Sequence, residues 1–212
     1  MEDGLTLFIY FMLSLLISGA GALPPGLINL AIADRTIKRG FRSGLVMLAG
    51  AACTEFFYTF IPLFFIDRLS RNPHIEYALQ IAVTGIFLIL AAVYYFKKTD
   101  VILPTTKVSS KRRDFGYGIL MAGMNLLIIP FWVFISIWLG SNGFPIDTWG
   151  QILTCALGST AGACLVFVLY ARLGKFIVKR SDEITKSINQ IIAGLFLLLG
   201  LFQLGRLLFY AR

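Results

Sequence analysis

The sequence has little charge, a single histidine and few cysteines, and each shortage excludes a class of protein. Charged residues make up 14% of the 212 residues and hydrophobic residues 58%, with a mean hydropathy of +0.80. An ordinary soluble domain contains about 25% charged residues, so the composition excludes a soluble fold. The three cysteines form no Cys-x-x-Cys pair, and His74 is the only histidine. The sequence patterns typical of zinc sites are therefore missing.

Apolar segments occupy almost the whole chain. Each reaches the roughly 20 residues that a membrane-spanning helix needs. We therefore predict an all-α integral membrane protein with six transmembrane helices, which leaves no room for a soluble catalytic domain and argues against an enzyme. The predicted spans are Leu5–Ala33, Gly44–Ile66, Tyr77–Phe96, Gly116–Leu139, Trp149–Tyr170 and Ile188–Tyr210.

Lysine and arginine residues are concentrated in three of the connections between these spans. The first, third and fifth connections hold fifteen of the 19 Lys and Arg residues. The positive-inside rule then places the odd connections in the cytoplasm and both termini outside. A net charge of +8 divided among three loops suits topology and contact with anionic membrane lipid, and we expect no nucleic-acid partner.

An unusual stretch, Gly19–Asn29, interrupts the first apolar segment. Pro24 and Pro25 remove two backbone donors, and Gly26 adds conformational freedom directly after them. Unpaired backbone groups are tolerated in a bilayer only against protein or water, so we predict a broken helix that forms a binding site or path. An ordinary proline kink is the alternative. We expect Asp34–Arg42, which follows, to be a short basic turn.

The second predicted span contains Glu55, some eleven residues from either end. An ionisable side chain at that depth is a functional-site candidate by default. Helical spacing places Glu55 on the same stripe as the hydroxyl residues Tyr58 and Thr59. The alternative is a protonated Glu55 that is hydrogen-bonded to a neighbouring helix for stability alone.

The fourth predicted span contains Asn125 and Pro130. A proline at position 130 is expected to leave the Leu126 carbonyl without its helical partner, so this helix is also predicted to be perturbed, close to a buried amide. Pro130 then corresponds to Pro25 of the first span. The longest connection, Lys97 to Asp114, is polar and basic and forms the natural midpoint of the chain.

The two halves of the chain are weakly similar to each other. Ala49–Cys53 resembles Thr160–Cys164, and Thr84–Ala91 resembles Ala193–Gly200. Each half has an odd number of helices, so the second half enters the membrane from the opposite side, which predicts two inverted three-helix repeats. The predicted single membrane domain, 1–212, comprises repeat one (1–96), a basic cytoplasmic loop (97–114) and repeat two (115–212).

Two motifs carry a resemblance to a known family. Leu23–Leu30, followed by Arg39–Gly44, resembles the helix-one Pro-Gly-Pro motif and basic turn of the lysine exporter (LysE/RhtB) translocator family. Asn125–Phe131 resembles that family's second motif, commonly Asn-Leu-Leu-Asn-Pro-Lys. The resemblance covers essentially the whole chain.

The resemblance implies an exporter of amino acids or related small metabolites, driven by a proton or ion gradient. It also implies a multi-pass protein of the bacterial cytoplasmic (inner) membrane with no cofactor. The chain departs from the two motifs at Leu27, Ile129 and Phe131, which indicates a divergent member. Its solute, its coupling ion and whether it is a homodimer stay open.

We expect the two halves to alternate access to a site lined by the first and fourth spans. The N–H groups after the break are expected to bind a substrate carboxylate. The two asparagines orient the substrate, and Glu55 carries the coupling proton or meets a substrate ammonium. The predicted site residues are Pro24, Pro25, Gly26, Asn29, Glu55, Tyr58, Asn125 and Pro130.

Two alternative functions come from other classes of protein. A divalent metal-ion exporter normally needs several oxygen ligands, whereas the predicted membrane core supplies one carboxylate, Glu55. A membrane thiol-redox carrier would use Cys53 and Cys164, but neither cysteine adjoins a proline. Cys155 and Cys164 face opposite sides of one helix. Small buried apolar residues are the alternative interpretation of all three thiols.

Overall fold

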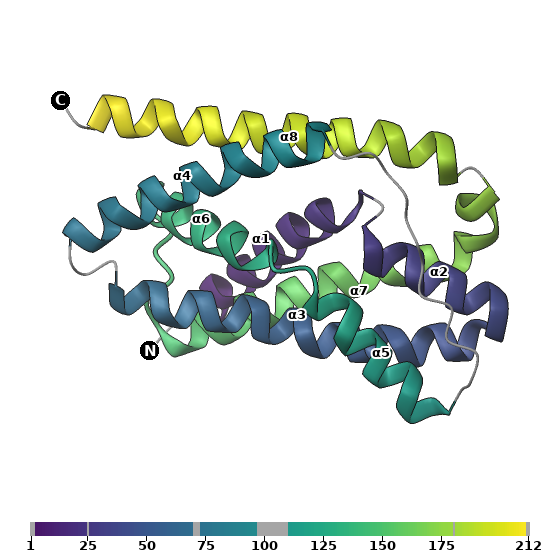
Figure 1. The fold of residues 1–212 in the computed structure, drawn as a ribbon. Coiled ribbons are helices and arrows are strands. Elements are labelled where there is room, and N and C mark those ends of the chain that lie inside the picture. The colour runs from purple at the N-terminus through teal and green to yellow at the C-terminus, as the bar shows by residue number, and fades with distance from the viewer. Residues whose placement is uncertain (1–2, 25, 70–72, 97–109, 180, 211–212) are drawn as a thin grey trace. The chain divides into compact units, whose positions relative to one another are not determined.

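A computed structural model describes residues 3–24, 26–69, 73–96, 110–179 and 181–210. Every regular element in these ranges is an α-helix (Figure 1). The elements are α1 (Gly4–Ala22), α2 (Leu27–Arg39), α3 (Phe41–Leu69), α4 (Pro73–Phe96), α5 (Lys111–Gly123), α6 (Ile128–Ser141), α7 (Trp149–Lys179) and α8 (Ser181–Tyr210). The prediction of an all-helical chain is therefore confirmed for the described residues.

The long apolar helices match most of the predicted spans. Helices α1, α3, α4 and α7 are each long and apolar enough to cross a membrane, and α5 and α6 together make a fifth span that is bent by 59° at its break. The apolar part of α8, at Ala193–Leu208, is shorter. The chain is thus a multi-pass membrane protein.

The predicted first span is divided into two helices. Helix α1 ends at Ala22 and α2 begins at Leu27, so the predicted helix break is present. Pro25 lies outside the described residues. Gly26 precedes α2 in an extended conformation (φ −88°, ψ 176°) and serves as its N-cap.

The expected basic turn at Asp34–Arg42 is wrong. Helix α2 continues to Arg39, and Gly40 alone separates it from α3. Gly40 has a φ of 87°, which only glycine adopts easily, and Lys38 and Arg39 in the last turn suit the negative end of the helix dipole. The basic residues therefore end a helix instead of interrupting one.

The break in the fourth span precedes Pro130. Helix α5 ends at Gly123 and α6 begins at Ile128, so Pro130 falls in the first turn of α6, where N–H groups have no helical acceptor in any case. The Ile129 N–H donates to the Leu126 carbonyl at 3.3 Å. The prediction that Pro130 leaves this carbonyl unpaired is wrong.

The contacts divide the chain into two units. The first unit holds α1, α2, α3 as far as Ile61, α5 and α7; the second holds α3 from Pro62, α4, α8 and most of α6. In the second unit, Phe87 packs against Phe134 and Phe196 with ring centroids 5.3 Å and 5.7 Å away. The division into repeats 1–96 and 115–212 stays a prediction.

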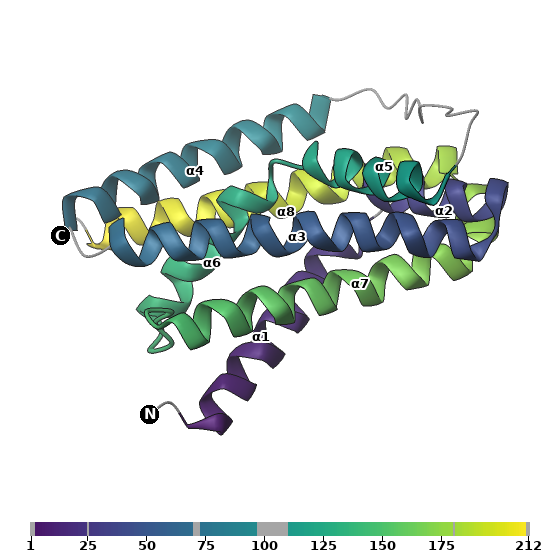
Figure 2. The ribbon, with the colours of Figure 1, turned by 90° about the horizontal axis from the view of Figure 1, so that it is seen from below.

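Two crossings in the first unit bring helix backbones into direct contact. Helix α1 crosses α7 (Figure 2), and a Cβ on Gly162 would overlap the carbonyl oxygen of Leu15. Helix α5 crosses α3, and a Cβ on Gly50 would overlap the carbonyl oxygen of Phe115. Glycine is needed at both places because any side chain would separate the helices. Gly158 and Gly162 of α7 thus belong to the surface that meets α1.

The core of the first unit lies between α2, α3, α5 and α7. Half of its ten buried side chains among the described residues are alanines, which allow these helices to pack closely. The ten are Ile28, Ala31, Ile32, Met47, Ala51, Met121, Ala122, Ala163, Phe167 and Ala171. Both helix breaks belong to this unit.

Candidate functional site

The first break is held by side chains that reach the carbonyl groups at the end of α1. Asn29 Nδ2 donates to the carbonyl oxygens of Ala22, at 2.7 Å, and Pro24, at 2.9 Å. The Tyr170 hydroxyl, from α7, donates to the Leu23 carbonyl at 2.8 Å. Three consecutive carbonyls that lost their helical donors have therefore found replacements.

The N-terminus of α2 faces the opposite situation, because the donors of its first turn have no hydrogen-bond partner among the described residues. Leu27 and Ile28 lie in the first helical turn, where backbone N–H groups have no acceptor within the helix. No side chain caps this end, and the Gly26 carbonyl accepts only the usual helical bond from Leu30, at 3.1 Å. These donors and the helix dipole favour an anionic group here.

Asn29 adds an acceptor beside these donors. The side chain is 2% exposed, and its Oδ1 has no hydrogen-bond partner among the described residues. A buried, unpaired amide oxygen costs free energy unless another donor reaches it. The first break therefore presents backbone donors and one acceptor within the first turn of a single helix.

The second break is built differently. The Tyr58 hydroxyl, from α3, donates to the Gly123 carbonyl at 2.8 Å. Most of the other bonds are made by the backbone, including Asn125 N–H to the Ala122 carbonyl at 2.9 Å and Ile128 N–H to the Asn125 carbonyl at 3.4 Å. The side chain of Asn125 is half-buried and makes no hydrogen bond to a described residue.

The two breaks have matching partners. Each receives a tyrosine hydroxyl from the helix that its first half crosses: α7 for the break after α1, and α3 for the break after α5. Tyr58 follows Gly50 by the same number of residues as Tyr170 follows Gly162. The predicted alignment pairs Gly50 with Ala161, whereas the contacts pair Gly50 with Gly162, one residue further along.

Glu55 is buried on the face of α3 that packs against α7. The residue is 6% exposed, and its carboxyl group makes no hydrogen bond or ion pair with a described residue. One turn further along α3, Thr59 Oγ1 lies 2.9 Å from Ser159 Oγ, which fixes this face toward α7. Glu55 is thus an interior carboxyl group of the first unit.

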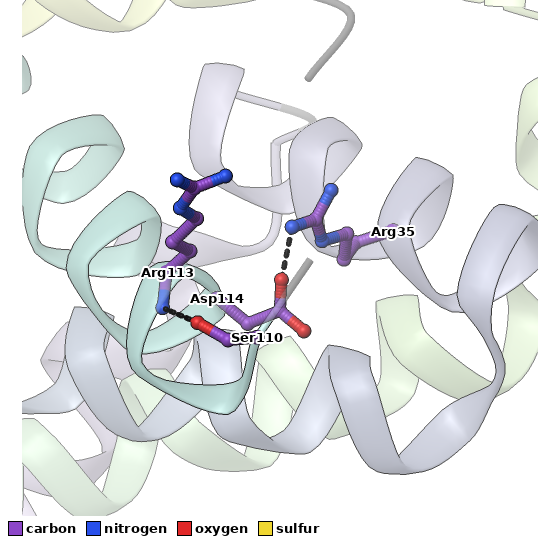
Figure 3. Close-up of polar contacts among 4 residues, drawn as sticks. All are labelled: Arg35, Ser110, Arg113 and Asp114. Carbon is purple, nitrogen blue, oxygen red and sulfur yellow. Dashed lines mark hydrogen bonds and ion pairs between the residues drawn. The ribbon is translucent and has the colours of Figure 1, made fainter. Parts of the chain in front are cut away.

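A buried ion pair joins α2, which follows the first break, to α5, which precedes the second break. Arg35 of α2 pairs with Asp114 of α5, and the two residues are 6% and 2% exposed (Figure 3). The Arg35 guanidinium also lies 5.8 Å from the centroid of the Tyr117 ring. Ser110 is the N-cap of α5, and its hydroxyl accepts a hydrogen bond from the Arg113 N–H at 3.4 Å.

Sequence comparison decides the family. Residues 19–206 match the profile of the LysE type translocators. The chain belongs to the LysE type translocator family. The resemblance predicted from the two motifs is therefore confirmed, and the protein is a membrane transporter from a family of exporters, not from a family of enzymes. Searches of curated proteins and of solved structures found no significant match.

Six of the predicted site residues of this LysE type translocator lie in three places within the first unit. Pro24, Gly26 and Asn29 form the first break, Asn125 lies in the second, and both Glu55 and Tyr58 lie on α3. Pro130 belongs to the second unit, whereas these residues belong to the first. The roles of these residues in transport stay predictions.

Two features of the first unit were missed by sequence reasoning. Tyr170 was treated only as the end of a predicted span, although its spacing from Gly162 repeats that of Tyr58 from Gly50. Arg35 was assigned to topology, although Asp114, an acid directly after three basic residues, could have indicated a buried partner. Both contacts depend on which helices meet in space.

The remaining candidate ligands are dispersed. Among the described residues, no group of three or more His, Cys, Asp or Glu side chains is placed to hold a metal ion. Cys53 is exposed, Cys155 is buried and Cys164 is half-buried, and none of the three forms a disulfide.

Proposed function

We propose that this LysE type translocator exports amino acids or related small metabolites from the bacterial cytoplasm by alternating access, coupled to a proton or ion gradient. The observation that carries the proposal is the N-terminus of α2, where uncapped N–H groups stand beside the unpaired Oδ1 of Asn29. A substrate carboxylate fits the donors, and a substrate amino group fits the acceptor.

Asn29 has two tasks in this proposal. Its two amide hydrogens hold the end of α1, so only its oxygen is left for a ligand. An amide oxygen accepts hydrogen bonds, which suits an ammonium or hydroxyl group of the substrate. Asn125 has a side chain without a bond to a described residue, and it supplies a second orienting group from the other break.

Glu55 is the proposed carrier of the coupling proton, or the partner of a substrate ammonium. A carboxyl group without partners is costly inside a membrane protein unless it is protonated or meets a cation. Its burial in the unit that contains both breaks supports either role.

Two inverted repeats of three helices, with both termini outside, are the proposed architecture. The support comes from the exchange of partners: α1 of the first half crosses α7 of the second, and α5 of the second half crosses α3 of the first. A two-fold relation between the repeats 1–96 and 115–212 would generate this exchange. The basic loop 97–114 would then lie in the cytoplasm.

The test is efflux of radiolabelled amino acids from proteoliposomes, with and without a pH gradient, by the wild type and by Glu55→Gln. We expect the gradient to stimulate efflux by the wild type, and we expect Glu55→Gln to lose that stimulation because an amide does not exchange a proton. Asp147→Asn, which alters an exposed carboxylate, is the matched control and should behave as the wild type. If Glu55→Gln is still stimulated by the gradient, the proton role is wrong.

The same vesicles separate this proposal from the two alternatives. Replacing Cys53 and Cys164 by Ala should leave efflux unchanged, whereas a thiol-redox carrier would lose its activity. A metal-ion exporter would release a divalent cation from loaded vesicles and would ignore amino acids.

A further inference from the structure

Two tyrosines occupy equivalent places at the two breaks, and each donates a hydrogen bond to the backbone there. Each hydroxyl donates to a backbone carbonyl at 2.8 Å: Tyr170 to Leu23, and Tyr58 to Gly123. A hydroxyl that points its hydrogen at the protein backbone does not present that hydrogen to a substrate. The two side chains therefore act on the breaks themselves.

The position of each tyrosine is set by a helix crossing. Helix α1 meets α7 at Gly162, and α5 meets α3 at Gly50, where backbone touches backbone. Each tyrosine lies roughly two helical turns further along the same helix, which is the distance needed to reach the end of the crossing helix. The crossing and the hydroxyl bond thus form one repeated arrangement.

We propose that Tyr58 and Tyr170 are a matched pair of positioning residues, each of which holds the carbonyl end of one helix break from the opposite half of the chain. The inference rests on the proposed function, in which the two breaks form the transport site. A carbonyl released from its hydroxyl partner would be unpaired, and the last helical turn would rearrange to recover a donor.

These bonds suit a moving part. Hydrogen bonds between membrane helices are individually weak, so they can break and re-form during each transport cycle. The first break has Asn29 as a second anchor, because its amide donates to the Ala22 and Pro24 carbonyls. The second break has its own backbone bonds as a second support. Removing one hydroxyl should therefore loosen one break and leave the chain folded.

The test removes the hydroxyl groups one at a time, with Tyr170→Phe and Tyr58→Phe, in the full-length protein in detergent. Tyr77→Phe, on the exposed face of α4, is the matched control. Hydrogen–deuterium exchange is measured by mass spectrometry on peptides that cover residues 19–30 and 120–130. We expect exchange about three- to fivefold faster in 19–30 for Tyr170→Phe and in 120–130 for Tyr58→Phe, with the other peptide unchanged.

A second arm measures the rate of labelled amino-acid efflux by the same variants. Both positioning variants should export several-fold more slowly than the wild type and than Tyr77→Phe, at an unchanged melting temperature within about 2 °C. Unchanged exchange at both breaks, equal loosening of both peptides by either variant, or normal efflux by both variants would overturn the proposal. If the wild type exports none of the amino acids, the proposed function fails, and the exchange data alone decide whether the two tyrosines position the breaks.

Discussion

The two helix breaks have the same place in their halves of the chain but are stabilised in different ways. The first contains Pro24, which has no N–H, and its carbonyls are held by Asn29 and Tyr170. The second break, Met124–Leu127, is closed by hydrogen bonds of its own backbone. Among the described residues, only the Tyr58 side chain donates to the carbonyl of Gly123, which directly precedes this break. The break that contains Pro24 therefore depends on side chains from α2 and α7 to satisfy its carbonyl groups.

The difference has a functional meaning within the proposal. The first break is held by outside side chains, and the first N–H groups of the helix that follows it have no acceptor among the described residues. A break that closes by turns consumes its own donors. The first break is therefore better suited to bind a substrate carboxylate, and the second to bend, as the 59° angle between α5 and α6 illustrates.

The largest expected effect comes from the ion pair that joins the helices of the two breaks. Arg35→Met would leave Asp114 buried and unpaired, so we expect a loss of about 3–5 kcal/mol in the free energy of unfolding, measured by chemical denaturation in detergent. Lys38→Met, which removes an exposed pair with Asp34, should cost under about 0.5 kcal/mol.

A double variant separates the charge from its packing. Arg35→Met combined with Asp114→Leu should recover most of the lost stability, because no buried charge is then left alone. Equal losses for Arg35→Met and Lys38→Met would show that the buried pair does not hold these helices together.

A smaller effect should distinguish the two breaks directly. Asn29→Leu removes both amide donors and leaves the Ala22 and Pro24 carbonyls unpaired, for an expected loss of about 2–3 kcal/mol. Asn125→Leu removes no bond to a described residue and should change stability by less than about 0.5 kcal/mol. Thermal unfolding of both variants in the same detergent tests the difference. If the two variants lose equal stability, the breaks are not held in different ways.

The smallest effect tests what the breaks share. Gly50→Ala and Gly162→Ala each place a methyl group against a backbone carbonyl, and we expect similar losses of about 1–2 kcal/mol after the gain in helix propensity. Gly116→Ala, on α5 but with open space around it, should be neutral or stabilising. Melting temperatures provide the comparison. A loss at only one crossing would contradict the equivalence of the two crossings.

Local sequence features predicted local structure well. Two consecutive prolines followed by a glycine predicted the first break, because the missing proline N–H groups and the permissive glycine torsions affect only the residues next to them. The second break was placed at Pro130, but the chain bends before it, since a proline in the first turn of α6 removes no helical bond. A proline therefore indicated the right helix and the wrong position.

Contacts between distant segments were harder to predict. Arg35 and Asp114 are far apart in the chain, and only the packing of α2 on α5 brings them together. Tyr170 was missed because the predicted alignment of the halves was one residue out of register with the packing. A shift of one residue turns a helical side chain by about 100°, which was enough to hide the second tyrosine.

The junction at Gly40 sets a mechanical constraint on the first unit. The Gly40 N–H donates to the Thr36 carbonyl at 2.9 Å, and the Gly40 carbonyl accepts the Ser43 N–H at 3.1 Å, so the one residue between α2 and α3 is hydrogen-bonded to both helices. Any displacement of α2 by a bound solute would be transmitted through this stiff joint to the start of α3. Glu55 lies about four turns along α3, so within the proposed function this joint would connect the first break to the helix that carries the buried acid.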